Sequence, residues 1–520
     1  MNTDIFNTKT KIANSTNNAG GNAFSFDARH CLSQIAATNC FNGTFYASSD
    51  KNLELAKKAA LSLKDDPEFI AKVAVYARKK SYMKDMPAFL VAILSEINTS
   101  LFRKIFPLVV DNGKMLRNVI QIARSGILGK KANISAGTWR HAIQQWFNDH
   151  NEDDIFRAIV GNNPTLSDIL KMSHPKPNSP QKESLFGYIV GRDIDLNKLP
   201  EKVRLFEEFK KNPSSKIPPD IDFRLLDSLH LGEREWCVIA ENAPWHMTRM
   251  NLATFARHGV FNNEKIVSII ANRLKNRETI EKSRVFPYQL FAAWKTIKDN
   301  KDIPDSVSKA LHEAFEISLS NVPEINGNGL VCVDASGSMG QPITGFRRNN
   351  SSSITCADVA GLIASAVIRK NPNSQVWTFS DQAVPVEINP KDSVLFNTEK
   401  LNNAGGGTNI SAPMIKFNEM GIKADWVLYV SDYESWLDFS NNYYGETCLS
   451  KEWNKFKTNN SNAKLICCDL TPRDNSQMPC NKDTLQVGGF SDHVFDVIAD
   501  FCNKNLASDA WVSEIKAIEL

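Results

Sequence analysis

The stretch "VCVDASGSMG", residues 331–340, decides the fold of the second half of the chain. It opens on apolar or β-branched residues, as a buried strand does, and runs directly into Asp334, Ser336 and Ser338. A carboxylate and two hydroxyls this close to a strand end indicate a functional turn. Three kinds of site are compatible with the pattern: a nucleophile elbow, a phosphate-binding loop, or part of a metal site.

Short β-rich runs alternate with helical stretches after Gly329. The runs are "GLVCVD" (329–334), "SQVWTFS" (374–380), "DWVLYVSD" (425–432) and "AKLICCDL" (463–470), and the helical stretches cover residues 356–370, 411–421 and 491–505. Alternation of this kind predicts a doubly wound α/β domain with a parallel sheet. We place the domain boundary near Pro323, so that this domain covers residues 324–520.

The carboxyl ends of strands are where such sheets bind ligands. Asp334 and Asp432 each end a predicted strand, and Thr408 lies between them in the glycine-rich stretch "AGGGTNIS" (404–411). With Ser336 and Ser338 they form an all-oxygen set, two carboxylates and three hydroxyls. A hard cation prefers oxygen ligands, so the sequence predicts a divalent cation site, with Mg²⁺ as its occupant. Hydroxyl ligands add no charge, which leaves the cation able to accept an anionic ligand from a partner.

The other two kinds of site fit the turn less well. A nucleophile elbow needs G-x-S-x-G, and Asp334 stands where its first glycine would precede Ser336. A phosphate-binding loop needs a Lys after its glycines, and none follows here. A helix N-cap would explain one residue of the turn, but not Thr408 and Asp432 at separate places in the chain.

The chain before Pro323 has a helical pattern with almost no strand signal. Apolar residues recur three and four apart in residues 52–65, 67–80, 86–97, 115–128, 137–149, 151–161, 262–274 and 287–298. Short polar connectors join these segments, which predicts stacked antiparallel helical pairs. The polar, Asn-rich residues 1–24 are interpreted as a disordered arm, so the helical domain covers residues 25–323.

Charge is distributed unevenly between the halves. Residues 1–325 contain 45 Lys and Arg against 36 Asp and Glu, whereas residues 326–520 contain 16 against 22. Residues 114–146, 170–182 and 244–261 are basic and free of acids, with Trp or Phe in two of the three. Each stretch alone is also typical of a solvated basic helix. Together they favour a nucleic-acid surface, because Lys and Arg neutralise phosphates and aromatic rings stack on unpaired bases.

Composition limits the class of protein further. No apolar run approaches the roughly 20 residues that cross a bilayer, and the N-terminus has no apolar signal region. The 10 cysteines show no C-x-x-C spacing. We therefore expect no membrane segment, reduced thiols and a cytoplasmic protein.

The back half resembles a von Willebrand factor A domain. D-x-S-x-S after a strand, a Gly-Gly-Thr loop and the Asp of "VLYVSD" are similar to the metal-ion-dependent adhesion site of that family. The resemblance implies that the metal ligands are Asp334, Ser336, Ser338, Thr408 and Asp432. An insertion, "GQPITGFRRNNSSSI" (340–354), follows the first ligands and is expected to border the site.

The front half resembles the Ro autoantigen family. "YMKDMPAFLVAIL", "SDILKMSHPKP", "PWHMTRMNLATFARHGVF" and "FPYQLFAAWKTIK" are similar to the landmarks of its TROVE module, and the order of the two domains also fits. The resemblance covers residues 25–520 and is strongest to bacterial members.

This second resemblance implies a function as well as a fold. The TROVE module would be a closed ring of HEAT-like helical pairs, with a basic hole for single-stranded 3′ ends of misfolded small RNAs and an outer surface for Y-type RNAs. In bacteria the family can work with an exoribonuclease such as polynucleotide phosphorylase. By motif position, the candidate RNA contacts are His174, Lys176, Arg140, His141, Arg249 and Arg257, followed by Lys130 and Lys131.

We therefore expect a monomeric, non-catalytic RNA-binding protein that acts in RNA quality control. One alternative is a protein-interaction scaffold, in which the metal site grips a carboxylate of a partner. Another is a metal-dependent hydrolase that uses Asp334 and Asp432. The hydrolase lacks a convincing general base, since Asp358 and Glu434 are the only nearby candidates and neither has an evident partner.

Overall fold

A computed structural model describes residues 13–38, 41–42, 44–213, 217–226, 229–282, 285, 287–346, 354–402, 404–435, 447–471, 473–489, 492–504 and 510–520. The chain divides into two compact units. Residues 1–86, 286–288 and 318–519 form the first, which we call the sheet unit. Residues 87–285 and 289–317 form the second, the helical unit.

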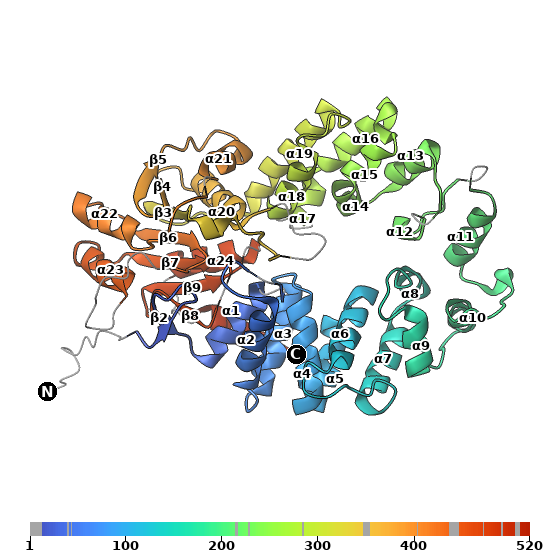
Figure 1. Cartoon of the computed structure of the whole chain (residues 1–520). Helices are drawn as coiled ribbons and strands as arrows, with labels where there is room; N and C mark the ends of the chain where they lie inside the picture. Colours follow the sequence, from blue (N-terminus) through green and yellow to red (C-terminus); the bar gives the residue numbers. More distant parts are fainter. Residues whose placement is uncertain are drawn as a thin grey trace. The chain divides into compact units, whose positions relative to one another are not determined.

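The sheet unit is built around a six-stranded sheet (Figure 1). In spatial order its strands are β5 (Ala383–Val386), β4 (Gln375–Phe379), β3 (Gly329–Asp334), β6 (Trp426–Ser431), β7 (Lys464–Asp469) and β9 (Thr484–Gly488). All neighbours are parallel except β4 and β5. This confirms the predicted doubly wound domain, to which the structure adds β5 and β9.

Helices cover this sheet and seal its core. They are α20 (Cys356–Lys370), α21 (Val394–Leu401), α22 (Ala412–Met420), α23 (Cys448–Asn459) and α24 (Asp492–Asn503), and α25 (Ala510–Lys516) packs on α24. Helix α20 packs on β3 and β6 and is buried from Cys356 to Ile368. On another side of the sheet, Trp377 packs edge-on against Phe417 with ring centroids 5.2 Å apart.

The N-terminal segment also belongs to the sheet unit. Strands β1 (Ser15–Thr16) and β2 (Asn22–Ser25) form a small antiparallel sheet with β8 (Asn475–Ser476). Helices α1 (Ala28–Thr38), α2 (Ser49–Leu61) and α3 (Pro67–Lys79) follow, and α1 and α3 both contact α25. The predicted disordered arm is therefore wrong for residues 15–24, because strand pairing and the burial of Ala23 and Phe24 order them; residues 1–12 lie outside the described part.

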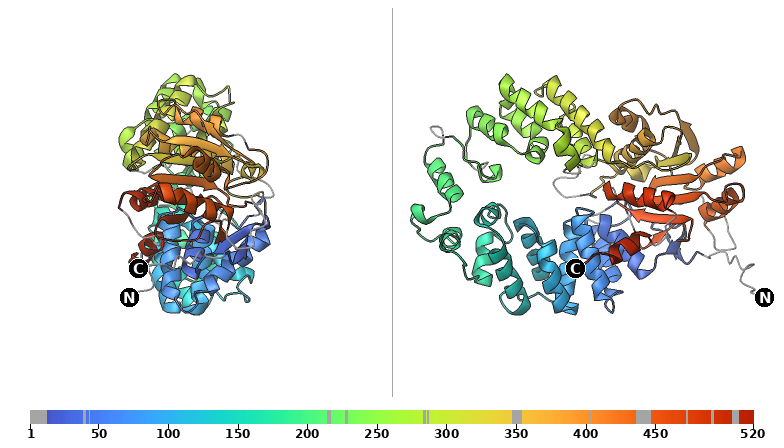
Figure 2. Two further views of the ribbon diagram at one scale, coloured as in Figure 1. Left: turned by 90° about the vertical axis from the view of Figure 1, so that its left-hand side faces the viewer. Right: turned by 180° about the vertical axis from the view of Figure 1, so that it is seen from behind.

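Helices make up almost all of the helical unit. In chain order they are α4 (Asp85–Ile97), α5 (Thr99–Val109), α6 (Gly113–Ser125), α7 (Gly137–Asp149), α8 (Glu152–Arg157), α9 (Leu166–Ser173), α10 (Pro180–Ile189), α11 (Glu201–Lys211), α12 (Phe223–Leu226), α13 (Glu233–Asn242), α14 (Trp245–Met250), α15 (Leu252–Arg257), α16 (Glu264–Leu274), α17 (Arg277–Lys282), α18 (Pro287–Ile297) and α19 (Asp305–Ser318). From α5 to α16 they follow one another along a curved path (Figure 2). The prediction of a helical region is confirmed.

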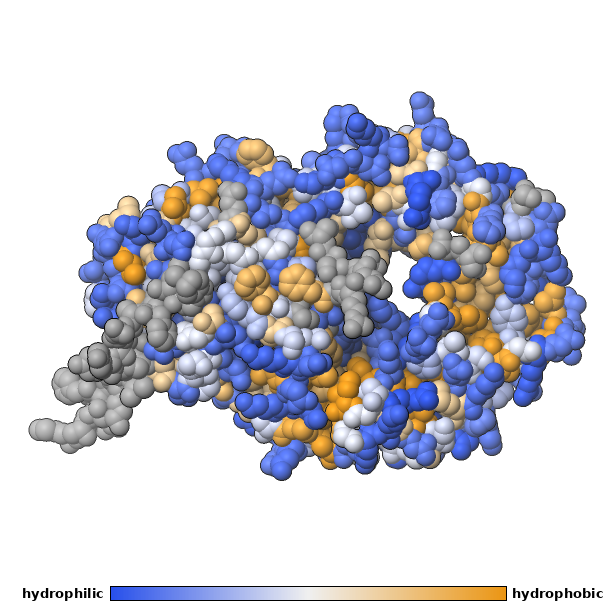
Figure 3. Space-filling view, viewed as in Figure 1, coloured by the Kyte–Doolittle hydropathy of each residue, from blue (hydrophilic) through white to orange (hydrophobic). Residues whose placement is uncertain are grey.

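Polar side chains begin these helices where the sequence predicts connectors. The side chains of Asn98, Asn112 and Thr165 accept hydrogen bonds from backbone amides in the first turns of α5, α6 and α9. Polar residues cover most of the visible surface, and apolar ones gather in smaller patches (Figure 3). Among the described residues, no helix has both the length and the apolar composition needed to cross a membrane.

Candidate metal centre and basic surface

The order of the sheet brings the two predicted carboxylates together. Strand β3 lies between β4 and β6. The chain therefore continues from β3 to β4 on one side, and the later strand β6 is placed on the other side of β3. Asp334 is the last residue of β3, and Asp432 directly follows β6. Both side chains are fully buried. The carboxylates therefore meet where the strand order reverses, which is where open α/β sheets bind ligands.

Short hydrogen bonds fix the Asp334 carboxylate. Its Oδ1 accepts from the backbone amide of Ser336 over 2.8 Å, and its Oδ2 accepts from the Ser431 hydroxyl over 2.5 Å. Ser336 and Ser338 follow on the same turn, with their hydroxyl oxygens 3.2 Å apart. The turn therefore presents two buried hydroxyls beside a carboxylate that is already oriented.

The glycine-rich loop reaches this turn through its backbone. The amide of Gly405 donates to the carbonyl of Ala335 over 2.8 Å, and the amide of Gly337 donates to Gly406 over 3.1 Å. Gly406 has φ +80°, and a Cβ there would lie 2.8 Å from Oδ2 of Asp381. Thr408 follows on this loop and is buried. The glycines thus allow the close approach that brings Thr408 to the site.

The electrostatics of the site favour a bound cation. Burial raises the pKa of Asp334. Burial, with the Asp334 and Glu434 carboxylates as further causes, raises the pKa of Asp432 to about 7. Two carboxylates that share a buried site are not readily ionised together, because their negative charges repel each other. A divalent cation would stabilise the ionised form of both. In the described part of the chain no three His, Cys, Asp or Glu form a metal-binding group, so a cation here would depend on the hydroxyls as well.

The two candidate bases of a hydrolase are engaged elsewhere. Asp358 accepts hydrogen bonds from the Thr355 amide over 2.8 Å and from the Asn402 side chain over 2.6 Å, as part of the N-cap of α20. Glu434 is buried and pairs with Arg473 at 3.1 Å. Both carboxylates therefore make structural contacts, Asp358 at a helix N-cap and Glu434 in a buried ion pair.

Part of the insertion 340–354 lies beside the candidate metal centre. Gln341 is buried, and its amide nitrogen donates to Oδ2 of Asp432 over 3.4 Å. Ile343 and Ile354 are joined by a backbone hydrogen bond of 3.0 Å, which closes the base of the insertion. Residues 347–353 of the insertion lie outside the described residues.

In the helical unit, several predicted RNA contacts lie together. Arg140 on α7 donates through Nε to the carbonyl of Ser173 at the end of α9, over 3.2 Å. Gln144, one turn further along α7, donates to the carbonyls of Ser173 and His174 over 2.8 and 3.1 Å. His141, His174 and Lys176 are exposed beside these contacts. We call Arg140, His141, His174 and Lys176 the α7–α9 cluster.

Comparisons with known proteins identify both halves of the chain. A family model described as the Ro60 vWA domain matches residues 329–502, and another described as the TROVE domain matches residues 236–303. The RNA-binding protein RO60 of Deinococcus radiodurans is 23% identical over 533 residues, which cover 93% of this chain and 94% of that protein. The chain therefore contains a match to the Ro60 vWA domain and a match to the TROVE domain, and it is similar to a Ro protein over almost its whole length.

A solved structure agrees with the fold of this chain. The crystal structure of the Ro (RSR) protein of Deinococcus radiodurans matches it with a TM-score of 0.63 and 18% identity, over 92% of this chain and 100% of that one. This likeness supports the order of a helical region followed by a von Willebrand factor A fold.

Arg249 lies in a different environment from the α7–α9 cluster. Only 9% of the residue is exposed, and Nη1 donates to the carbonyl of Gln289 over 2.6 Å. Its guanidinium also lies over the Trp245 ring, 6.0 Å from the centroid, and burial lowers its pKa to about 10. The predicted role as an RNA contact does not fit this environment, because the side chain is used to join α14 to α18.

The remaining predicted contacts are exposed but lie apart from the cluster. Arg257 ends α15 and is exposed. Lys130 and Lys131 lie in the connector before α7, where Lys130 pairs with Glu96 at 2.8 Å. These side chains could reach a phosphate, but no other member of the predicted set is bonded to them.

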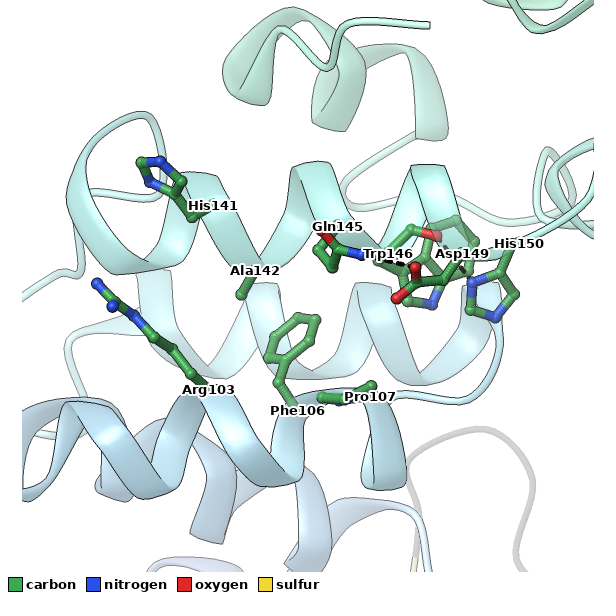
Figure 4. A pocket seen from close by; sticks show the side chains of 9 residues that line it. All are labelled: Arg103, Phe106, Pro107, His141, Ala142, Gln145, Trp146, Asp149 and His150. Carbon is green, nitrogen blue, oxygen red and sulfur yellow. Dashed lines mark hydrogen bonds between the residues drawn. The ribbon is translucent and has the colours of Figure 1, made fainter. Parts of the chain in front are cut away.

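A pocket between α5 and α7 extends from the cluster (Figure 4). Its volume is about 430 Å³, and its lining comprises Arg103, Phe106, Pro107, His141, Ala142, Gln145, Trp146, Asp149 and His150. Arg103 and His141 lie at one end, and His150 stacks on Trp146 at the other, with ring centroids 4.0 Å apart. Of this set only His141 belongs to the predicted RNA contacts, because Arg103 precedes the basic stretch and nothing local in the sequence connects it to α7.

Proposed function

We propose that this chain is a non-catalytic RNA-binding protein whose α7–α9 cluster contacts RNA. The single observation that carries the proposal is the gathering of exposed His141, His174 and Lys176 around the junction of α7 and α9. Cationic and ring-bearing side chains on a fixed backbone can contact phosphates and stack on unpaired bases. The name of the Deinococcus relative supports the same class of ligand.

The proposed ligands are Y-type small RNAs and single-stranded 3′ ends of misfolded RNAs, bound in the cytoplasm as part of RNA quality control. An exoribonuclease such as polynucleotide phosphorylase is the proposed protein partner, and the chain is proposed to act as a monomer in a ribonucleoprotein. Contacts of the cluster that depend on charge and stacking would select unpaired RNA rather than a base sequence.

We further propose that the sheet unit binds a divalent cation, Mg²⁺ in the cell. Asp334, Ser336, Ser338, Thr408 and Asp432 would hold it, and all five side chains are buried at the edge of the sheet. When bound, the cation would neutralise the negative charges of the two buried carboxylates. Ser431 orients Asp334, and Gln341 orients Asp432.

RNA binding is tested by changing the exposed members of the cluster. The variant carries Lys176→Gln, His141→Gln and His174→Asn; Asn is used at 174 because this residue has φ 46°, which Asn tolerates. The control carries Lys265→Gln and Lys282→Gln, two lysines of the same unit whose side chains are 72% and 76% exposed.

We expect the cluster variant to bind a single-stranded RNA oligonucleotide about tenfold more weakly than the wild type. The slope of log affinity against log salt concentration should decrease by about 0.7 for each phosphate that the variant no longer neutralises. The control should keep both values. Equal affinity and equal salt slope in all three proteins would overturn the assignment.

A further inference from the structure

The pocket between α5 and α7 shares one residue, His141, with the α7–α9 cluster. Its volume of about 430 Å³ lies in the range of about 300–1,000 Å³ in which proteins bind small molecules. Phe106, Ala142 and Trp146 form its apolar wall, and each is at most 8% exposed. A concave apolar surface of this size can take up a flat ring, and it lies directly beside the proposed RNA contacts.

The aromatic part of this wall is held in position by the protein itself. Trp146 donates from Nε1 to the carbonyl of Val110 over 2.8 Å. His150 stacks on the Trp146 ring, and its Nδ1 donates to the Trp146 carbonyl over 2.8 Å. Because these rings are already ordered, a ligand that contacts them would lose little free energy in fixing side chains.

One end of the pocket is cationic. Arg103 and His141 lie there together, and both are exposed (Figure 4). Nη2 of Arg103 donates to the Thr138 hydroxyl over 3.3 Å, which joins α5 to the start of α7. A planar guanidinium binds phosphate well. Since His141 also belongs to the cluster, an RNA strand bound by the cluster can continue to this end of the pocket.

Further along α7 the pocket presents hydrogen-bond acceptors. Nε2 of Gln145 donates to Oδ1 of Asp149 over 2.6 Å, which orients the carboxylate. Both side chains line the pocket and are exposed. An ionised carboxylate only accepts hydrogen bonds, and its two oxygens can accept several. This part of the pocket therefore favours a ligand edge that carries N–H donors.

We propose that the pocket binds an unpaired guanine base of the RNA, with a neighbouring phosphate on Arg103 and the N–H edge of the base on Asp149. This inference rests on the proposed RNA binding. Guanine carries two adjacent donors, N1–H and the N2 amino group, which one carboxylate can accept together. Uracil has a single donor between two carbonyl oxygens, and adenine and cytosine each place an acceptor nitrogen beside their amino group. Those acceptors would face the carboxylate and be repelled by it.

The experiment measures how tightly the full chain binds two fluorescent single-stranded oligonucleotides of about ten nucleotides, by fluorescence anisotropy. One contains only uridine, and the other alternates guanosine and uridine, so that both carry the same charge. Asp149→Asn changes the proposed base contact, and Glu183→Gln makes the same change of charge at an exposed residue outside the pocket. Arg103→Gln changes the proposed phosphate contact, and Lys104→Gln is its control at the next, exposed residue of α5, also outside the pocket.

We expect the wild type to bind the guanosine-containing oligonucleotide about tenfold more tightly than the uridine one, as a bidentate base contact does. Asp149→Asn should remove most of this preference, and Glu183→Gln should keep it. Arg103→Gln should weaken binding of both oligonucleotides and decrease the slope of log affinity against log salt concentration by about 0.7. Lys104→Gln should change neither quantity.

A further variant separates this inference from the proposed function. Lys176→Gln, at a residue of the cluster outside the pocket, should weaken binding of both oligonucleotides and keep the preference for guanosine. Three results would each overturn the guanine pocket and leave the RNA proposal standing: equal wild-type affinities for the two oligonucleotides, a preference that persists in Asp149→Asn, or an unchanged salt slope in Arg103→Gln. A wild type that binds neither oligonucleotide would overturn both.

Discussion

The indole Nε1 of Trp511 donates a hydrogen bond to the hydroxyl of Tyr76 over 2.8 Å, although the two residues are 435 positions apart in the chain. Both are buried, at 1% and 4% exposure. The bond joins α25, near the C-terminus, to α3, near the N-terminus. The two ends of the sheet unit therefore depend on each other for stability.

This contact predicts unequal costs for two substitutions. Trp511→Ala should lower the free energy of unfolding by about 3–5 kcal/mol, because it leaves a large cavity. Tyr76→Phe should lower it by about 1–3 kcal/mol, because it leaves the buried indole N–H without its acceptor. Urea unfolding measures both. Leu61→Ala, at a residue that is 41% exposed, should change stability by less than about 0.5 kcal/mol and serves as the control.

His30 should make the sheet unit sensitive to acid. Burial lowers its pKa from 6.5 to about 4, with Asp27 opposing the change. Between these values the unfolded chain binds a proton that the folded chain does not. The free energy of unfolding should therefore fall as the pH is lowered through this range, by up to about 1.4 kcal/mol per pH unit from this group.

The test compares His30→Phe with the wild type in thermal melts at several pH values. Phe keeps the packing beside Phe26, whose ring centroid lies 4.6 Å from that of His30. The difference in stability between the two proteins should depend on pH below about 6.5 and level off above it. Leu61→Ala, at an exposed position without a titratable group, should keep the wild-type profile. A difference that is independent of pH would exclude His30 as the source.

Alanine substitutions at two neighbouring glycines of the glycine-rich loop (404–411) should have different effects on stability. Gly406→Ala introduces a Cβ at φ +80°, 2.8 Å from Oδ2 of Asp381, whereas a Cβ at Gly405 has no atom within 4 Å. Gly406→Ala should cost about 1–2 kcal/mol of stability and weaken Mg²⁺ binding. Gly405→Ala should leave both nearly unchanged. Similar losses in the two variants would show that the loop is not strained at Gly406.

Divalent cations should stabilise the wild type through Asp432. At a free Mg²⁺ concentration 100 times the dissociation constant, the expected gain is about 2.7 kcal/mol, seen as a higher melting temperature that EDTA reverses. Asp432→Asn should remove this response. Without metal this variant should be at least as stable as the wild type, because burial and Asp334 already disfavour the Asp432 charge. Glu419→Gln, whose side chain is 57% exposed, is the control.

The sequence predicts those parts of the fold that local patterns determine. β3 and α20 have the bounds that the alternation of apolar runs and helical stretches indicates. Asp334 and Asp432 come together because adjacent parallel strands end at one edge, a rule that needs no knowledge of distant contacts. The sequence does not predict β5 and β9, because these strands have only four and five residues and show little periodic pattern.

Local sequence patterns do not predict residues whose roles depend on contacts with distant parts of the chain. Arg473 lies 429 positions after Thr44, to whose hydroxyl it donates, and no local motif marks this pair. The basic stretch around Arg249 predicts an RNA contact, but pairing with Gln289 turns the side chain inward. Ser431 is visible in "VSD", but it lies within the predicted strand, and no local pattern shows that its hydroxyl bonds to Asp334.

The small sheet of β1, β2 and β8 has a consequence for how the protein is made. β2 consists of Asn22–Ser25 and its partner β8 of Asn475–Ser476, so Phe24 pairs with a residue more than 400 positions later in the chain. Pairing over such a separation is intrinsically slow, and it cannot begin before β8 has been synthesised. Until then β2 lacks its β8 partner, which makes this segment a site for chaperone binding during translation.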